Sequence, residues 1–163
     1  MSDIRFVDTT VRDGSQSLWA IGMRTGMILP IVQRLDDAGF DAVEIMATSF
    51  EKKMIRDLQE DPWERLVEVR RRMRKTPLRM IRGRQLAAFQ ITPDAVEDLW
   101  YDRMAAMGIG QIRLSDSSNT PAGWQKNMVR ARKVGIDVII NLIFSLSEKH
   151  SDDYYALRAR EAA

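Results

Sequence analysis

Short runs rich in β-branched and apolar residues alternate along this chain with longer stretches in which apolar residues recur every three to four positions. The short runs are typical of strands and the longer stretches of amphipathic helices. Strands are predicted at residues 4–8, 42–46, 78–81, 111–114 and 137–144, and helices at 27–38, 52–59, from 62 on, from 93 on, 124–134 and from near 151. The apolar composition of the fifth run predicts a fully buried strand.

Prolines and a threonine mark the starts of two predicted helices. Pro62 and Pro93 suit the first helical turn, where the missing N–H costs nothing. Thr92 is a candidate N-cap for the helix that Pro93 opens. The buried stripe of that helix is predicted to consist of Val96, Leu99, Trp100 and Met104.

The repeated strand–helix order predicts a parallel sheet with right-handed crossovers. A barrel and an open doubly wound sheet both satisfy this order, and the pattern does not choose between them. No linker or low-complexity tract divides the chain, so residues 1–163 are interpreted as one domain.

The charge balance and the absence of cysteine exclude several classes of function. The net charge is +2, from 25 basic and 23 acidic residues that are mixed along the chain, so we expect neither nucleic acid nor a membrane as a partner. Without cysteine, disulfides, thiolate metal sites and cysteine nucleophiles are excluded. No charged-then-apolar leader precedes the first strand, and we expect a cytoplasmic protein.

Polar residues gather where the predicted strands end, which is where parallel α/β folds place their reacting groups. These positions hold Asp8, Thr9, Thr10, Arg12, Asp13, Gln16, Glu44, Arg82, Asp116 and Asn119. Most isolated residues of this kind cap helices or turn corners. The cluster after the first strand is interpreted as functional, because adjacent Arg12 and Asp13 can place an anion-stabilising guanidinium beside an oxygen ligand for a divalent metal. The scattered glycines form no phosphate-binding loop, so nucleotide binding is unsupported.

Residues 7–20, Val-Asp-Thr-Thr-Val-Arg-Asp-Gly-Ser-Gln-Ser-Leu-Trp-Ala, resemble the first strand and loop of the carboxyltransferase domain of pyruvate carboxylase, oxaloacetate decarboxylase and transcarboxylase. The Arg-Asp-Gly-x-Gln element also occurs across the wider superfamily, with hydroxymethylglutaryl-CoA lyase and isopropylmalate synthase. Residues 60–66, Glu-Asp-Pro-Trp-Glu-Arg-Leu, and residues 76–78, which lead to Arg82 and Gly83, resemble the carboxyltransferase branch specifically. Further similarity lies in residues 112–116 with Asn119, and in residues 147–150 with Tyr154 and Tyr155.

The fold that this resemblance implies is α/β, an incomplete (β/α)₈ TIM barrel that contains about the first five parallel strands with their helices. Residues 1–163 would then be the N-terminal part of a domain that usually needs about 250 residues. We expect a truncated chain or a partner chain that completes the barrel. Five strands alone would leave two sheet edges and an apolar inner face uncovered.

The resemblance also implies roles for particular residues. Arg12 would stabilise an enolate oxygen, Gln16 would orient the substrate, and Asp13 would coordinate the metal. Arg82 would pair with the substrate carboxylate, with Phe89 beside it, and Glu44 and Asp116 would lie behind the site. Phe89 stands where the family has tyrosine. Residues 46–50 replace a Trp-Gly-Gly run with Met-Ala-Thr-Ser-Phe, whose end resembles the lyases. The family's other metal ligands, a carboxylated lysine and two histidines, belong to later strands.

The implied enzyme moves a carboxyl group between oxaloacetate or pyruvate and carboxybiotin through an enolate, using a divalent metal (Zn, Mn or Co). Its partners would be a 2-oxo acid, a biotin carrier domain or subunit, the missing C-terminal barrel half and further copies in a homo-oligomer. This segment by itself is expected to be inactive. The alternatives are an aldol-type lyase or Claisen-type synthase that acts on a CoA thioester, and a non-catalytic half-barrel that serves as an interaction module.

Overall fold

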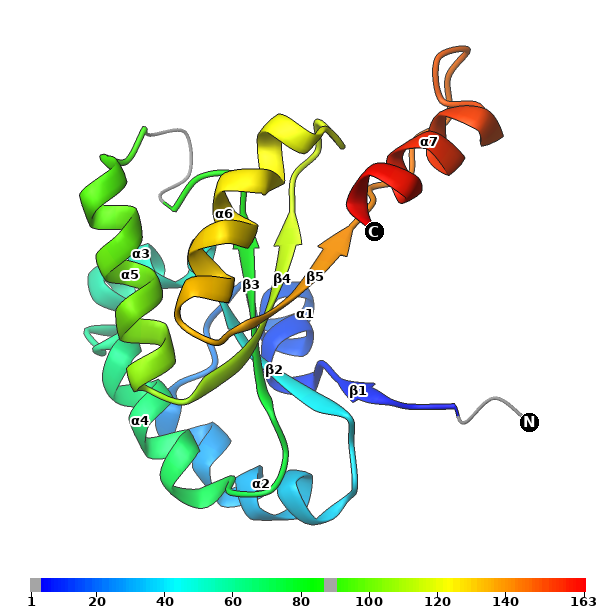
Figure 1. The fold of residues 1–163 in the computed structure, drawn as a ribbon. Helices are drawn as coiled ribbons and strands as arrows, with labels where there is room; N and C mark the ends of the chain where they lie inside the picture. The colour runs from blue at the N-terminus through cyan, green and yellow to red at the C-terminus, as the bar shows by residue number, and fades with distance from the viewer. Residues whose placement is uncertain (1–3, 87–90) are drawn as a thin grey trace.

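The computed structural model describes residues 4–86 and 91–163, which form one five-stranded parallel sheet surrounded by helices (Figure 1). The strands are β1 (Val7–Asp8), β2 (Ala42–Ala47), β3 (Leu78–Gly83), β4 (Ile109–Ser115) and β5 (Asp137–Asn141). All four strand pairings are parallel, and the order in the sheet is β1-β2-β3-β4-β5.

The strand order decides between the two architectures that the sequence pattern allows. A doubly wound sheet reverses direction part-way, so its strands are out of sequence order, whereas barrel strands follow one another around the axis. Here each strand pairs with the next one along the chain. The predicted incomplete TIM barrel is therefore confirmed.

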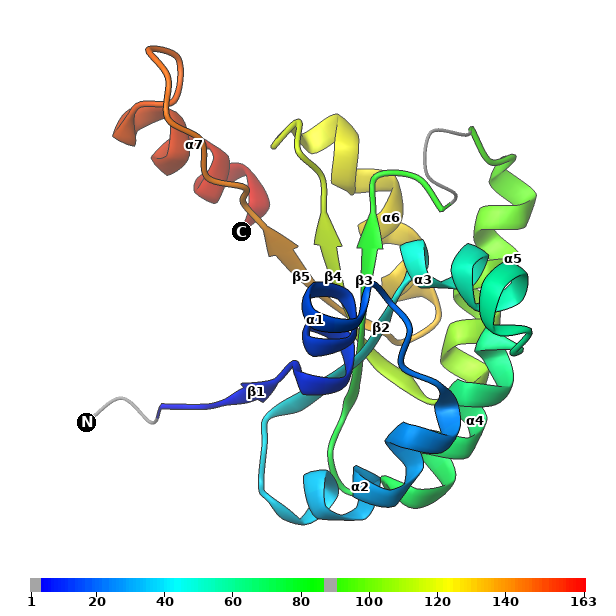
Figure 2. The same cartoon turned by 180° about the vertical axis from the view of Figure 1, so that it is seen from behind.

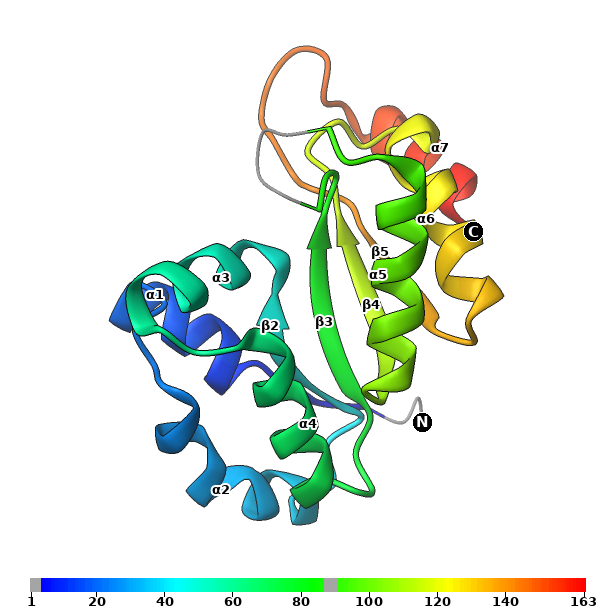
Figure 3. The ribbon, with the colours of Figure 1, turned by 90° about the vertical axis from the view of Figure 1, so that its left-hand side faces the viewer.

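Four helices connect consecutive strands: α2 (Thr25–Asp37), α4 (Pro62–Arg72), α5 (Asp94–Ala106) and α6 (Pro121–Lys133). The other elements are α1 (Ser15–Trp19), α3 (Thr48–Lys53), α7 (Asp152–Ala162) and two π-helical turns, η1 (Thr10–Gly14) and η2 (Met54–Leu58). In Figure 3, α5 and α6 line one face of β3 and β4, and α1 lies on the opposite side of these strands; Figure 2 shows the same arrangement from behind.

The sequence signals for helix starts hold at some positions and fail at others. Pro62 begins α4, where the side chain of Asp61 accepts a hydrogen bond from the backbone N–H of Trp63. Helix α5 instead has Pro93 at its N-cap position, with no side-chain cap, so the cap predicted at Thr92 is wrong. The stripe predicted for α5 is half right: Trp100 and Met104 are buried, but Val96 and Leu99 are 46% and 51% exposed.

The two faces of the sheet differ in chemistry, as β3 shows. Its residues alternate, so Leu78 and Met80 join the core beneath the helices while Arg79 and Ile81 lie on the other face. On that inner face, Arg79 donates two hydrogen bonds to the side-chain oxygen of Gln111, at 3.0 and 2.7 Å. The expectation of an apolar inner face is therefore wrong, because polar side chains pair across it.

The fifth strand also departs from its prediction. It ends at Asn141 rather than 144, and none of its residues is fully buried. Strand β5 pairs with β4 along one side and, within the described residues, has no strand on its other side. Its apolar residues thus lack the neighbour that would bury them. No helix in the described part of the chain is long and apolar enough to cross a membrane.

Candidate active site

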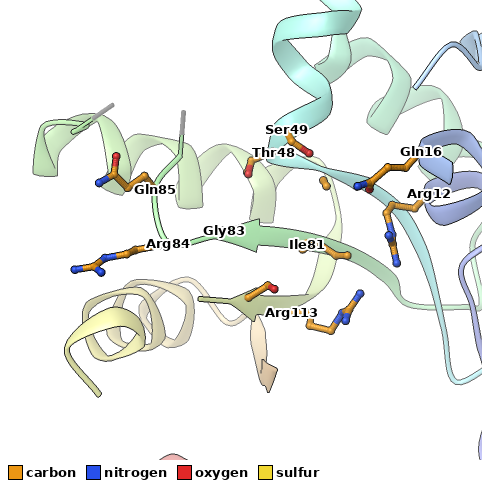
Figure 4. A pocket seen from close by; sticks show the side chains of 11 residues that line it. Arg12, Gln16, Thr48, Ser49, Ile81, Gly83, Arg84, Gln85 and Arg113 are labelled. Carbon is orange, nitrogen blue, oxygen red and sulfur yellow. The ribbon is translucent and has the colours of Figure 1, made fainter. Parts of the chain in front are cut away.

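A cavity of about 570 Å³ opens where β2, β3 and β4 end (Figure 4). Such a volume lies within the range of small-molecule sites. Its walls come from η1 and α1, the start of α3, and the inner face of β3 and β4. The lining residues are Arg12, Gln16, Ala47, Thr48, Ser49, Ile81, Gly83, Arg84, Gln85, Arg113 and Ser115.

Arg12 is fixed at one end of this cavity by a buried carboxylate. Its Nε and Nη2 donate to Oε2 of Glu44, at 3.0 and 2.8 Å. Glu44 is only 1% exposed and lies on β2, so the carboxylate is held by the sheet itself. Because both partners are buried and two N–H groups of Arg12 donate to the one oxygen Oε2, the guanidinium has a defined orientation.

Arg113 joins the same carboxylate from β4, and sequence reasoning missed it. Its Nε donates to Oε1 of Glu44 at 2.7 Å and its Nη2 to Oε2 at 3.2 Å. Glu44 therefore links two guanidiniums, and both arginines line the cavity. A signal for Arg113 was present, because Arg113 and Ser115 alternate with the buried Ile112 and Leu114 and so lie on the inner face.

The turn after β1 places Gln16 in the cavity lining and Asp13 beside Arg12, outside the lining. Asp8 ends the strand and accepts hydrogen bonds from the backbone N–H and the hydroxyl of Thr10, at 3.1 and 2.8 Å. The following turns bring Gln16 into the cavity lining. The carboxylate of Asp13 accepts from Nη1 of Arg12 at 2.8 Å and is 54% exposed. The predicted trio Arg12, Asp13 and Gln16 is thus brought together.

The chain offers an incomplete fit for a metal ion. The half-exposed carboxylate of Asp13, next to Arg12, is a suitable hard oxygen donor. Among residues 4–86 and 91–163, however, no group of three or more His, Cys, Asp or Glu side chains is arranged to hold a metal. Asp13 therefore supplies one ligand at most, and the rest would have to come from outside the described chain.

The sequence is similar to those of curated carboxylase and carboxyltransferase subunits. No family model matches the chain. It is 35% identical to a pyruvate carboxylase subunit of Methanocaldococcus jannaschii over 159 residues, 97% of this chain and 28% of the relative. It is 29% identical over 154 residues to the methylmalonyl-CoA carboxyltransferase 5S subunit of Propionibacterium freudenreichii subsp. shermanii, 94% of this chain and 30% of that one. The chain belongs to the carboxyltransferase domain family.

A solved structure of this carboxyltransferase family has the same fold. The carboxyl transferase domain of Rhizobium etli pyruvate carboxylase, determined with pyruvate and biocytin, matches with a TM-score of 0.91 and 26% identity. The match covers 99% of this chain and 29% of that one. The chain thus spans less than a third of the length of each of these carboxyltransferase relatives.

Arg82 does not lie with the other carboxyltransferase candidates. It is on the helix-facing side of β3, is 1% exposed and forms an ion pair with Glu97 of α5. Its guanidinium also lies 5.7 Å from the ring centre of Trp100. It does not line the cavity, so the structure does not bring Arg82 together with Arg12. Phe89 falls outside the described residues.

Asp116 is the last predicted site residue, and it lies behind the cavity. It is 5% exposed and accepts a hydrogen bond from the backbone N–H of Ser118 at 2.9 Å. Gly123 of α6 packs directly on its carboxylate, where an added Cβ would lie 1.8 Å from Oδ2. Asp116 thus joins the β4–α6 turn to the helix layer, and Gly123 is the residue that allows this approach.

The Glu60–Leu66 motif of the carboxyltransferase branch anchors the start of α2. Arg65 is 1% exposed, and it donates to the hydroxyl of Thr25, the backbone oxygen of Met23 and Oε2 of Glu60, all at 2.9 Å. Glu60 also accepts from the backbone N–H and the hydroxyl of Thr25. The motif therefore fixes the segment that leaves α1, the helix that bears Gln16.

Glu51 is a buried acid that sequence reasoning did not single out. Burial raises the pKa of its carboxyl to about 7 from an ordinary 4.5. The indole N–H of Trp100 donates to Oε1 at 3.3 Å, which opposes this rise without cancelling it. The side chain comes from α3 and lies near the positive charge of Arg82, which also opposes the rise. Glu51 therefore has a pKa near neutral pH, and it belongs to α3, whose first residues Thr48 and Ser49 line the cavity.

Proposed function

We propose that this chain forms the enolate-stabilising part of a carboxyltransferase active site that acts on a 2-oxo acid. One observation supports it above the others: a cavity at the carboxyl ends of the strands is lined by Arg12, Gln16 and Arg113, two of which are held by the buried Glu44. Fixed cations of this kind stabilise charge that develops in a transition state without needing to reorient.

Each of these residues has a defined task in the proposed reaction. The methyl carbon of pyruvate loses a proton, the resulting enolate carbon accepts the carboxyl group of carboxybiotin, and a biotin nitrogen keeps the bonding electrons and is protonated. Arg12 lies where it can stabilise the enolate oxygen, and Arg113 adds a second cation. Gln16 offers an amide to orient the 2-oxo acid. A divalent cation held in part by Asp13 would supply further stabilisation of negative charge.

The proposed partners follow from two facts: the chain spans less than a third of its relatives' length, and Asp13 alone cannot complete a metal site. A biotin carrier domain would deliver carboxybiotin, and the remaining barrel strands would close the inner face and complete the metal site. The solved relative that was determined with pyruvate and biocytin supports this assignment of co-substrates. The names of the two curated relatives, carboxylase and carboxyltransferase, favour carboxyl transfer over the cleavage of a CoA thioester.

A segment-exchange experiment tests the proposed function. The chain replaces the aligned 159-residue stretch of the Methanocaldococcus jannaschii pyruvate carboxylase subunit, and the hybrid is assayed for carboxyl transfer between oxaloacetate and biotin. We expect activity, and a loss of about 100-fold or more in kcat for Arg12→Gln, the range seen when one oxyanion donor is removed. A folded hybrid without activity, or an Arg12→Gln hybrid as active as its parent, would contradict the proposal.

A further inference from the structure

Arg79 places a positive charge on the inner face of the sheet. Its neighbours on β3, Leu78 and Met80, are buried on the helix side, so the side chain of Arg79 lies on the opposite face with that of Ile81. In a complete barrel this face becomes a packed interior, filled by layers of side chains from all the strands. Arg79 is only partly buried in this chain, and strands that close the barrel would bury it fully.

The hydrogen bonds of Arg79 do not neutralise its charge. Its Nε and Nη2 both donate to Oε1 of Gln111, a neutral acceptor, at 3.0 and 2.7 Å. Within residues 4–86 and 91–163, its Nη1 donates no hydrogen bond and its guanidinium forms no ion pair. An amide oxygen satisfies two of the donors of this guanidinium, but it supplies no counter-charge.

The carboxylates whose charge reaches Arg79 are engaged by other arginines. Burial lowers the pKa of the Arg79 guanidinium below its ordinary value, and the charges of Glu44 and Asp41 oppose this without cancelling it. Glu44 already accepts four hydrogen bonds from the two cavity arginines, and Asp41 pairs with Arg5 at 3.3 Å. Asp137, the first residue of β5, is exposed and forms no ion pair in the described part of the chain. The described residues thus offer Arg79 no carboxylate of its own.

We infer that the barrel half that completes this chain supplies a buried aspartate or glutamate to the guanidinium of Arg79. The inference rests on the part of the proposed function that assigns the remaining barrel strands to the inner face. Those strands are the occupant because the aligned stretch is 97% of this chain but only 28% of the Methanocaldococcus jannaschii subunit. In an eight-stranded barrel they also lie across the interior from β3 and β4. A carboxylate that accepts from Nη1 offsets the penalty of burying the guanidinium there.

The sign of one substitution tests this inference. Arg79→Met nearly keeps the length of the side chain and removes its charge. If the other half supplies a carboxylate, the substitution leaves that carboxylate buried without a partner and destabilises the closed barrel. If it supplies none, the substitution removes an unpaired buried charge and stabilises the barrel. Hydrogen–deuterium exchange of the β3 and β4 amides, measured in the segment-exchange hybrid and in this chain alone, reports which occurs.

We expect Arg79→Met to accelerate exchange of these amides by about tenfold or more in the hybrid. In the chain alone, where water reaches the guanidinium, the change should be less than about threefold. Arg79→Lys, which keeps the charge, should recover part of the protection in the hybrid. Arg103→Met, the same change at an exposed arginine on α5, should alter exchange in neither. A crystal structure of the hybrid should show a carboxylate oxygen within about 4 Å of the Arg79 guanidinium.

The outcomes separate this inference from the proposed function, because the readout is protection and not activity. Unchanged or slower exchange in the Arg79→Met hybrid, or a hybrid structure with only neutral groups around Arg79, overturns the inference even if the hybrid is active. Faster exchange in an inactive hybrid supports the inference and counts against carboxyl transfer. If the chain alone dimerises and Arg79→Met already has its full effect in that dimer, the occupant is a second copy and the assignment to the remaining strands is overturned.

Discussion

Replacing Glu44 by glutamine should destabilise the chain strongly, because this one carboxylate anchors both cavity arginines. Glu44 accepts four N–H donors, from Nε and Nη2 of Arg12 and of Arg113, at 2.7 to 3.2 Å. Glutamine has nearly the same shape but removes the negative charge and turns one acceptor into a donor. That donor would face guanidinium N–H groups, which cannot accept a hydrogen bond.

The magnitude follows from the burial of the three side chains. Breaking a buried ion pair by removing one partner costs about 3–5 kcal/mol, because the remaining charge is left without compensation. Arg12 is almost fully buried, but the side chain of Arg113 is 24% exposed and can recover some hydration. We therefore expect the low end of the range, about 3 kcal/mol. With a urea dependence of about 2 kcal/mol per M, the midpoint of unfolding falls by about 1.5 M.

Urea unfolding followed by circular dichroism gives this midpoint directly. Glu148→Gln is the matched control, because the same chemical change at an exposed residue should alter stability by less than about 0.5 kcal/mol. Arg12→Gln, made both in the native chain and in Glu44→Gln, completes a double-mutant cycle. The cycle should report a coupling free energy between Arg12 and Glu44. A Glu44→Gln midpoint equal to that of the control, or zero coupling in the cycle, would refute the claim that Glu44 holds the two guanidiniums.

Three further substitutions have expected outcomes that urea midpoints can check. The pKa of Glu51 is raised by burial to about 7, so its contribution to stability is fully present below pH 4.5 and is lost as pH rises through about 7. Glu51→Gln should therefore remove the fall in stability between about pH 4.5 and 7. Burial alone would raise the pKa of Asp36, but hydrogen bonds, first among them that from the backbone N–H of Thr76, hold it below 3.8. Its stabilisation is therefore present above pH 3.8 and lost as pH falls through the lower folded value, and Asp36→Asn should be less stable at neutral pH but no less stable in strong acid. Gly123→Ala should destabilise the chain by about 1–3 kcal/mol, because the new Cβ overlaps the carboxylate of Asp116; an unchanged midpoint would contradict that packing.

The sequence predicts the strands and helices of this fold better than it predicts which side of each element faces the core. Periodicity is a local property, so the strands and helices could be located, and the sequential strand order agrees with the barrel that the resemblance implied. Val96 and Leu99 fit the apolar period of α5, yet they stay exposed, because only the side of the helix with Trp100 and Met104 meets the sheet. The side of α5 that is buried depends on how the helix packs on the sheet, which the local sequence does not determine.

The candidate site shows the same limit more clearly. Arg12, Asp13 and Gln16 could be grouped because they share one short turn; in the structure Arg12 and Gln16 line the cavity and Asp13 contacts Arg12. Arg82 was placed beside them by its position at the end of a strand, but it has the same parity as the buried Leu78 and Met80 and so points to the helix layer. The pairing of residues 44 and 113 depends on strands far apart in sequence, and local patterns carry no information on such a contact.

A crystal structure of the chain soaked with oxalate, a stable mimic of enolpyruvate, tests the central claim most directly. The account predicts oxalate in the cavity with its oxygens within hydrogen-bond distance of Arg12 and Gln16, and with the Arg12–Glu44 pair intact. Oxalate bound elsewhere, or an Arg12 side chain turned away from the cavity, would contradict it.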